Sequence, residues 1–378
     1  MENRAGVFMK QPSGYSSFIP KKLPPDPPLN IDLEMLKLLS DADRKLGRLD
    51  GITQILPNPE LFVAMYVQKE AVLSSQIEGT QASLTDVLDA GADSKNETDI
   101  QDVVNYVAAM NYGLNRLKDF PLCLRLIKEI HEKLLECGRG SNRNPGEFRT
   151  TQNWIGPAGC TLSNASFIPP TVPDMLNALS DLESFFYEED NIPSLIKIAL
   201  IHAQFESIHP FLDGNGRVGR LLITFWLCYE KILTEPLLYL SYYFKSNRIE
   251  YYDRLMAVRK SGDWEGWVKF FLKGVAAVSD EATESARLII NLKEHYSQIL
   301  STRGNNHYMQ LFDRLFQHPF ITKNDAVKLL NISYPTASNI IEEFVNLNIL
   351  TDITPNQQRN KRYGFTEYVA ILNRGTEL

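Results

Sequence analysis

Residues 209–220 of the chain read HPFLDGNGRVGR, and the fold can be worked out from the place of this run between two predicted helices. Gly214 and Gly216 allow backbone N–H groups to approach an anion closely. Arg217 and Arg220 are three positions apart, so on a helix they share a face from which both guanidinium groups can bind phosphates. The run therefore predicts a nucleotide-phosphate site.

Three further side chains in the run suit phosphoryl chemistry. Asp213 can hold a Mg²⁺ ion together with phosphate oxygens, and Asn215 adds an amide donor. His209 lies just upstream, where it can take a proton from a hydroxyl that attacks phosphorus. Taken singly, each residue has a simpler interpretation, because a Gly- and Arg-bearing turn is usually only the start of a helix. Their occurrence together and in this order is far more specific.

The flanking sequence predicts a helix on each side of the run. Apolar residues recur at spacings of three and four over residues 194–208 and 217–232, as in amphipathic and buried helices. The glycine-rich loop would then lie at a helix N-terminus, where the helix dipole favours phosphate. Similar patterns dominate up to about residue 300, so we predict a mainly α fold.

The run resembles the signature of the Fic family, His-x-Phe-x-[Asp/Glu]-Gly-Asn-Gly-Arg-x-x-Arg, and every defined position is filled. Fic proteins mostly transfer the AMP of ATP to a Ser, Thr or Tyr hydroxyl of a protein and release pyrophosphate. The resemblance implies that His209 is the general base, that Asp213 is the Mg²⁺ ligand and that Arg220 binds the γ-phosphate. The nucleotide-binding residues that it implies within the run are Gly214, Asn215, Gly216, Arg217, Val218, Gly219 and Arg220.

A second motif, SSQIEG, occupies residues 74–79 at the end of an apolar helical stretch. Ser74 and Glu78 are four apart and share a helix face, and Gly79 is a natural helix C-cap. A glutamate on a helix is usually a solvated surface group. The resemblance instead implies an inhibitory helix of pattern [Ser/Thr]-x-x-x-Glu-[Gly/Asn], in which Glu78 pairs with Arg220. A carboxylate bound there removes a donor that the γ-phosphate needs, so we expect low resting activity.

Two weaker features concern the protein target and the nucleobase. Residues 150–170 are rich in turn residues with interspersed β-formers, which predicts a β-hairpin with its loop at 157–159; an ordinary surface loop is the alternative. The resemblance implies a flap that pairs with the target backbone by strand addition. It also implies an aromatic residue near adenine, for which Tyr251 is the first candidate and Tyr252 the second, although core packing is the default for either.

The chain divides into three predicted regions. Residues 1–110 form an N-terminal helical region that contains the inhibitory helix. Within this region, a proline-rich extended strap at 18–30 precedes the first helix. Residues 111–300 form the Fic catalytic core. The order of elements in residues 305–378 resembles a winged helix-turn-helix. Its expected helices and strands cover 311–316, 322–330, 334–346, 350–353 and 363–365.

DNA is a weakly supported partner for this last region. Its recognition helix would carry Ser333, Tyr334, Thr336, Ser338 and Asn339, and its wing Arg359, Lys361 and Arg362. However, residues 305–378 hold seven Lys/Arg and seven Asp/Glu, so the region lacks the positive charge on which affinity for DNA largely depends. Protein docking or dimerisation are the other uses of such a module.

Composition is that of an ordinary enzyme, with 378 residues, 44% hydrophobic, 22% charged and a net charge of −7. We expect a cytoplasmic protein, because no signal segment precedes the first helix and the longest apolar run, 221–229, is too short to span a bilayer. The cysteines, at positions 123, 137, 160 and 228, have no metal-binding spacing.

The function predicted from these observations is an autoinhibited protein adenylyltransferase that uses ATP and Mg²⁺. Its partner would be a protein with a hydroxyl side chain, possibly a copy of itself, and the resemblance favours a homodimer. The first alternative is a DNA-binding regulator whose Fic domain senses nucleotide, against which His209 argues, because a sensor needs no base. The second is a Fic enzyme that uses another donor or removes AMP, with Glu78 positioning a water.

Overall fold

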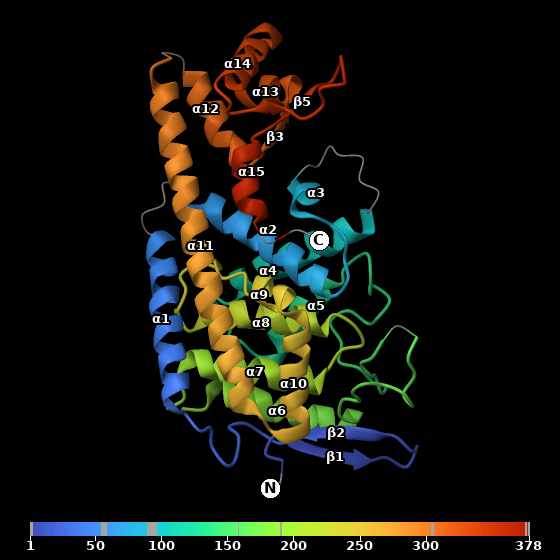
Figure 1. Cartoon of the computed structure of the whole chain (residues 1–378). Coiled ribbons are helices and arrows are strands. Elements are labelled where there is room, and N and C mark those ends of the chain that lie inside the picture. The colour runs from blue at the N-terminus through green and yellow to red at the C-terminus, as the bar shows by residue number, and fades with distance from the viewer. Residues whose placement is uncertain are drawn as a thin grey trace.

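The computed structural model describes residues 3–53, 59–88, 97–157, 159–189, 191–303, 306–374 and 376. It is mainly helical, as predicted, with small sheets near the N-terminus and in the C-terminal region (Figure 1). The elements are β1 (Gly6–Lys10), β2 (Ser16–Pro20), α1 (Leu33–Thr53), α2 (Pro59–Ile77), α3 (Leu84–Leu88), α4 (Glu97–Arg116), α5 (Leu124–Leu134), α6 (Val172–Tyr187), α7 (Ser194–Ile208), α8 (Asn215–Tyr229), α9 (Ser241–Ser246), α10 (Arg248–Ser261), α11 (Trp264–Ser301), α12 (Asn306–Leu315), β3 (Phe320–Thr322), α13 (Lys323–Leu330), α14 (Tyr334–Asn346), β4 (Thr351–Asp352), β5 (Arg362–Gly364) and α15 (Thr366–Asn373).

Helix α7 lies at the centre of the molecule and is buried from Leu195 to Ile208. A helix that is apolar on all sides must be surrounded by other elements, and α6, α8, α10 and α11 all pack against it. The long helix α11 in turn has α1 along its first half (Figure 1). Because α7 and α8 are both core helices, the loop that joins them is held in a fixed position.

The N-terminal segment differs from the predicted extended strap. Residues 6–20 form an antiparallel hairpin in which Gly6 is paired with Pro20, and the proline-rich chain is irregular only after it. Phe8 and Phe18 of this hairpin pack against Phe167 with ring centroids 6.5 and 5.8 Å away. The hairpin therefore supports the segment predicted to be the flap.

The predicted flap is less regular than a hairpin of two strands. Its ladder is a single antiparallel bridge, in which Ile155 donates to Phe167 O at 2.8 Å and Phe167 donates to Ile155 O at 3.1 Å. Glycine, proline and asparagine around the bridge disfavour a longer ladder. Within the predicted loop, Ala158 lies outside the described residues.

The C-terminal region contains its predicted helices and strands within a few residues, and adds β3 and α15. The three strands form an antiparallel sheet in the order β3-β5-β4. Between α11 and α12, residues 304 and 305 lie outside the described residues.

Helix α15 returns toward α2 (Figure 1). Asn373 Nδ2 donates to Thr85 Oγ1 at 3.0 Å, and Gln76 Nε2 donates to Thr376 O at 3.3 Å. The C-terminal region thus contacts the end of the predicted inhibitory helix. Among the helices of the described ranges, none combines the length and apolar character that crossing a membrane requires.

Candidate functional site

The loop between α7 and α8 is closed by its own backbone and side chains. His209 ends α7 in the left-handed conformation, with φ at 50°, and Gly214 precedes α8 with φ at 76°. The Asn215 amide donates to Phe211 O and accepts from Phe211 N–H, both at 2.8 Å. The Asn215 amide thus holds the loop together, and its predicted contact with phosphate remains a prediction.

The flap holds the backbone of His209. The His209 carbonyl accepts from Arg149 Nε and from Asn153 Nδ2, each at 3.1 Å, and Arg149 N–H donates to Pro210 O at 2.9 Å. Sequence reasoning missed both Arg149 and Asn153 as functional residues. Arg149 ends the sequence GEFR at 146–149, but nothing in its distance from residue 209 along the chain predicts a contact with His209.

The environment of His209 favours a neutral imidazole. Burial, together with the nearby Arg259 and Arg149 guanidinium groups, lowers the pKa of His209 to about 3. A neutral ring at physiological pH has a lone pair that can accept a proton, as a general base requires.

Arg220 is held by the two residues predicted to form the inhibitory pattern. Its Nε donates to Ser74 Oγ at 2.8 Å, and its Nη2 donates to Ser74 O at 3.0 Å and to Glu78 Oε1 at 2.7 Å. Burial alone would lower the pKa of Arg220 and raise the pKa of Glu78, because it disfavours both charged forms. The attraction between the two groups outweighs this effect, so the pKa of Arg220 is raised and that of Glu78 is lowered. The pair is therefore ionised at neutral pH.

The Glu78 carboxylate lies directly over the first turn of α8. A Cβ placed on Gly216 would clash with Glu78 Oε1 and lie 3.0 Å from Arg220 Nη1, so glycine is required for this close approach. Gly79, with φ at 97°, ends α2 and turns the chain away. The carboxylate thus occupies the anion-binding position that a helix N-terminus offers.

Arg217 makes a separate set of contacts. Its Nη2 is 3.5 Å from Asp213 Oδ1 and its Nη1 is 3.9 Å from Asp102 Oδ1. Asp102, on α4, is buried and also lies 3.3 Å from Arg139 Nε. Asp102 could not be identified from the sequence, because it belongs to no motif and lies far from residue 217 along the chain.

Val218 and Gly219 were predicted to bind nucleotide, which remains a prediction, and the structure shows that both also pack in the interior. Val218 is buried in the hydrophobic core. A Cβ on Gly219 would lie 2.6 Å from Glu206 Oε1 and 3.3 Å from the Phe205 ring. Both residues therefore serve the packing of α8 on α7.

Asp213 has the geometry for a single metal–carboxylate contact. Its Oδ1 accepts from Gly214 N–H at 2.6 Å, while 36% of the side chain is exposed. In the described part of the chain, no group of three or more His, Cys, Asp or Glu residues could hold a metal ion. The donor set therefore fits Mg²⁺ only if phosphate oxygens and water supply the other ligands, which is the usual arrangement for this ion.

His131 fixes the backbone of the same loop and was also missed by sequence reasoning. Its Nδ1 accepts from Gly146 N–H at 2.9 Å, so Nε2 carries the proton and donates to Asp213 O at 3.1 Å. The ring stacks on Phe211 with centroids 3.7 Å apart. His131 thereby holds the carboxylate-bearing residue of the loop in place.

The two tyrosine candidates differ in their exposure. Tyr251 is only 1% exposed, its hydroxyl is 2.9 Å from His202 Nε2, and its ring stacks on Phe244. It is packed in the core, and its predicted contact with the nucleobase remains a prediction. The neighbouring Tyr252 is 40% exposed and is the more accessible candidate.

Acid should destabilise the protein partly through His202. Burial lowers the pKa of His202 to about 3, so below pH 6.5 the unfolded state binds a proton that the folded state does not, and stability falls as pH falls. The pKa of Glu206 and of Glu70 is raised to about 7 by burial, which has the opposite effect. On acidification from pH 7 to pH 5, we therefore expect the melting temperature of the wild type to fall relative to that of a His202→Gln variant, in which the effects of the two glutamates remain and that of the histidine is absent. Parallel curves in thermal denaturation would contradict this assignment.

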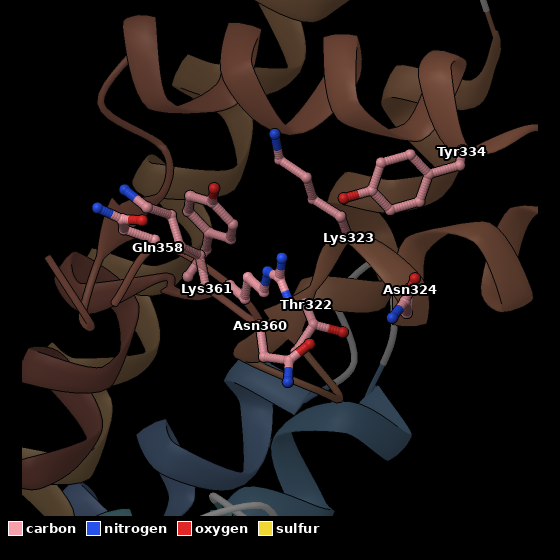
Figure 2. Close-up of a pocket in the computed structure, with 9 residues that line it drawn as sticks. Thr322, Lys323, Asn324, Tyr334, Gln358, Asn360 and Lys361 are labelled. Atoms are coloured by element: carbon pink, nitrogen blue, oxygen red, sulfur yellow. The ribbon is translucent and has the colours of Figure 1, made fainter. Parts of the chain in front are cut away.

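The C-terminal region has a separate polar pocket of about 380 Å³ between the segment 358–363 and residues of β3, α13 and α14 (Figure 2). Lys323 Nζ donates to Ser338 Oγ and to Glu342 Oε1 at 2.7 and 2.8 Å, and Lys361 Nζ donates to Asp352 Oδ2 at 2.8 Å. Two of its cations are thus already paired with carboxylates. The residues that line the pocket are Thr322, Lys323, Asn324, Tyr334, Gln358, Arg359, Asn360, Lys361 and Tyr363.

Comparison with protein families matches two segments of the chain. Residues 36–115 match the Fic/DOC family N-terminal region, and residues 121–227 match the Fic/DOC family itself. The second segment contains the loop between α7 and α8, and the first contains Ser74 and Glu78.

Curated relatives carry related names. The chain is 30% identical over 221 residues to protein adenylyltransferase Fic of Culex quinquefasciatus, which covers 54% of this chain and 40% of that protein. It is 26% identical over 282 residues to a probable protein adenylyltransferase of Aquifex aeolicus (strain VF5), covering 72% and 78%. The chain spans about 40% of the length of the insect relatives that it matches.

Solved structures with the same fold include a Fic family protein from Desulfovibrio desulfuricans G20. It has a TM-score of 0.59 at 21% identity, covering 89% of this chain and 97% of that one. A Fic domain containing signaling protein from Bacteroides thetaiotaomicron VPI-5482 has a TM-score of 0.51 at 18% identity, covering 65% and 97%. These two comparisons concern the fold alone.

Proposed function

Because the chain belongs to the Fic/DOC family, we propose that it is a protein adenylyltransferase kept at low activity by Glu78. One observation carries this proposal. The Glu78 carboxylate lies on Gly216 at the N-terminus of α8 and is bonded to Arg220, so an anion is already bound where the phosphates of ATP would bind. The names of the curated relatives support the same activity.

The reaction that we propose transfers AMP to a protein hydroxyl. His209 accepts the proton of the target hydroxyl. The oxygen of that hydroxyl forms a bond to the α-phosphorus of ATP, and the bond between the α-phosphorus and the leaving pyrophosphate breaks. The α8 N-terminus and the two motif arginines stabilise the negative charge of the phosphates. Asp213 would hold Mg²⁺, which neutralises phosphate charge when bound. The Tyr252 ring is the proposed contact for adenine.

The proposal extends to the surroundings of the enzyme. The target is a protein with a Ser, Thr or Tyr hydroxyl, with a second copy of the chain as one candidate, and the flap around Ile155 would align it. A cytoplasmic location suits an enzyme that consumes ATP. The homodimer and the division into regions at 1–110, 111–300 and 305–378 remain predictions from the sequence.

A labelling experiment tests the reaction. We expect the Glu78→Gly protein to incorporate label from ATP that is labelled on the α-phosphate, and none from ATP that is labelled on the γ-phosphate, because only AMP is transferred. Removal of Mg²⁺ with EDTA, or an Asp213→Ala substitution, should abolish incorporation. The measurements are intact mass and autoradiography of the protein incubated alone and with cell extract. Incorporation from the γ-phosphate would instead establish a kinase.

The alternative of a DNA-binding regulator is favoured only by the pocket of the C-terminal region (Figure 2). Its lining contains Lys323, Arg359 and Lys361, but the pairs with Glu342 and Asp352 reduce the charge available to phosphates. The remaining alternative, removal of AMP, would use Glu78 to position a water. The same labelling series separates it from transfer, because an AMP-removing enzyme would release label from a modified protein.

A further inference from the structure

Two buried polar atoms of neighbouring side chains in the site lack a hydrogen bond of standard geometry among the described residues, although the Glu206 backbone carbonyl also lies near the His209 ring and raises its pKa. The two atoms are Nδ1 of His209 and Oε1 of Glu206. The Glu206 side chain lies one turn before His209 on α7, and its other oxygen, Oε2, is 4.0 Å from His209 Nδ1. Glu206 is only 6% exposed, and leaving a carboxylate buried without a partner is unfavourable by several kcal/mol.

The fold keeps space for this carboxylate. A Cβ at residue 219 would lie 2.6 Å from Glu206 Oε1, so a larger residue there would push the carboxylate away. The Glu206 backbone is held as well, because Arg259 Nη2 donates to its carbonyl at 2.9 Å. The room beside Gly219 and the anchored backbone together retain an acidic side chain in a closely packed interface between α7 and α8.

We propose that Glu206 is a positioning residue for His209, whose carboxylate accepts the Nδ1 proton of the imidazole and so leaves Nε2 free as the base. The two ring nitrogens have different roles in general bases, and the partner of one nitrogen decides which nitrogen carries the proton. The proposal rests on the proposed function, since it assigns a role within that reaction.

The geometry needs only a small change. A hydrogen bond of about 2.8 Å between Oε2 and Nδ1 requires the carboxylate oxygen to move by roughly 1 Å. Hydrogen bonds between catalytic groups are often long in the absence of substrate. When Nε2 takes the proton of the target hydroxyl, the imidazole becomes positively charged, and the adjacent Glu206 carboxylate stabilises that charge.

Other charged groups face Glu206 and set its ionisation. Burial raises its pKa, Arg220 on α8 and Arg259 on α10 lower it, and Glu78, in the turn after α2, raises it. Departure of Glu78 from Arg220 would therefore favour the ionised carboxylate that the proposal requires.

The test compares substitutions in the Glu78→Gly protein. Glu206→Leu removes the acceptor, Glu206→Gln keeps an oxygen that can accept Nδ1–H, and Gln204→Leu is the matched control. Gln204 is a buried polar residue of the same helix, and its side chain donates to Lys21 O on the side away from the reaction. We expect Glu206→Leu to lower kcat by roughly a hundredfold with little change in the KM for ATP. Glu206→Gln should recover part of the loss, and Gln204→Leu should retain the parent rate.

The pH profile separates positioning from packing. Loss of the carboxylate removes a group that stabilises the imidazolium, so the acidic limb of kcat/KM should move to lower pH in Glu206→Leu. A Glu206→Leu protein with the parent rate, or with an unshifted acidic limb, would overturn the proposal.

A measurement without catalysis distinguishes failure of this inference from failure of the proposed function. ¹⁵N NMR of the labelled histidine should report a protonated Nδ1 at His209 in the parent and a changed tautomer in Glu206→Leu. An unchanged tautomer overturns the inference even if AMP is transferred. Absence of AMP transfer by the parent protein refutes the function, while the tautomer shift would still establish the contact.

Discussion

Replacement of His209 by alanine in the Glu78→Gly protein is expected to lower the rate of AMP transfer by roughly 10²- to 10⁴-fold, the usual contribution of a general base. The loss should appear in kcat, because the imidazole acts on the proton of the target hydroxyl and not on the phosphates. The measurement is the initial rate of label incorporation from ATP labelled on the α-phosphate.

Binding of ATP is the control for this substitution. The phosphates would be bound by the N-terminus of α8 and by Arg217 and Arg220, and none of these contacts involves the His209 side chain. The Kd for ATP, measured by titration calorimetry, should therefore stay within about twofold of that of the parent, a difference below 0.5 kcal/mol. Equal rates of transfer with and without the imidazole would show that another group takes the proton.

The second large effect is expected at Glu78. Its replacement by glycine frees the Arg220 Nη2 that now donates to Oε1 at 2.7 Å, and it clears the space over Gly216. A hydrogen bond between charged groups contributes about 1.5–3 kcal/mol, so we expect the rate of AMP transfer to rise about ten- to a hundredfold. The comparison is the initial rate of the variant against that of the wild type at the same ATP concentration.

Two companion variants show whether the gain depends on Arg220. Glu78→Gln keeps the size of the side chain but loses its charge, so its rate should fall between those of the wild type and Glu78→Gly. The double variant Glu78→Gly/Arg220→Ala should lose the gain, because the freed guanidinium is absent. A gain that survives in the double variant would mean that Glu78 restrains the enzyme by another route.

The residues that could be predicted from the sequence are those whose partners lie within the same short run or belong to a recognisable pattern. His209, Asp213 and the two motif arginines are carried by one loop, and the structure brings Ser74 and Glu78 to Arg220 as the pattern implied. This contact depends on the packing of α2 beside α8. It could be predicted only because the sequence pattern of the inhibitory helix is recognisable.

The supporting residues could not be predicted, because each acts through a contact between distant segments. Asp102 reaches Arg217 from α4, and Arg149 and Asn153 reach the His209 carbonyl from the flap. The exposure of Tyr251 and Tyr252 could not be predicted for a related reason. Adjacent residues on a helix point in different directions, and only the packing of α10 against α7 decides which ring is buried.

Strands were predicted less well than helices. The N-terminal hairpin was not predicted, because residues 6–10 and 16–20 show no regular alternation of buried and exposed positions that would indicate two strands. In the flap, β-formers indicated two strands where the structure has one bridge. Both errors arise because sheet formation depends on side-chain neighbours more than on local preference.

The contact between α15 and the end of α2 has a thermodynamic consequence. Gln76, two residues before Glu78, donates to the Thr376 carbonyl 300 residues later in the chain, so the positions of the two segments are energetically coupled. If a molecule bound to the C-terminal region displaced Thr376 and with it the end of α2, the proposed role of Glu78 implies that the affinity for ATP would change by some factor. By reciprocity, ATP would change the affinity for that molecule by the same factor. The occupancy of the nucleotide site can thus be transmitted to whatever the C-terminal region binds.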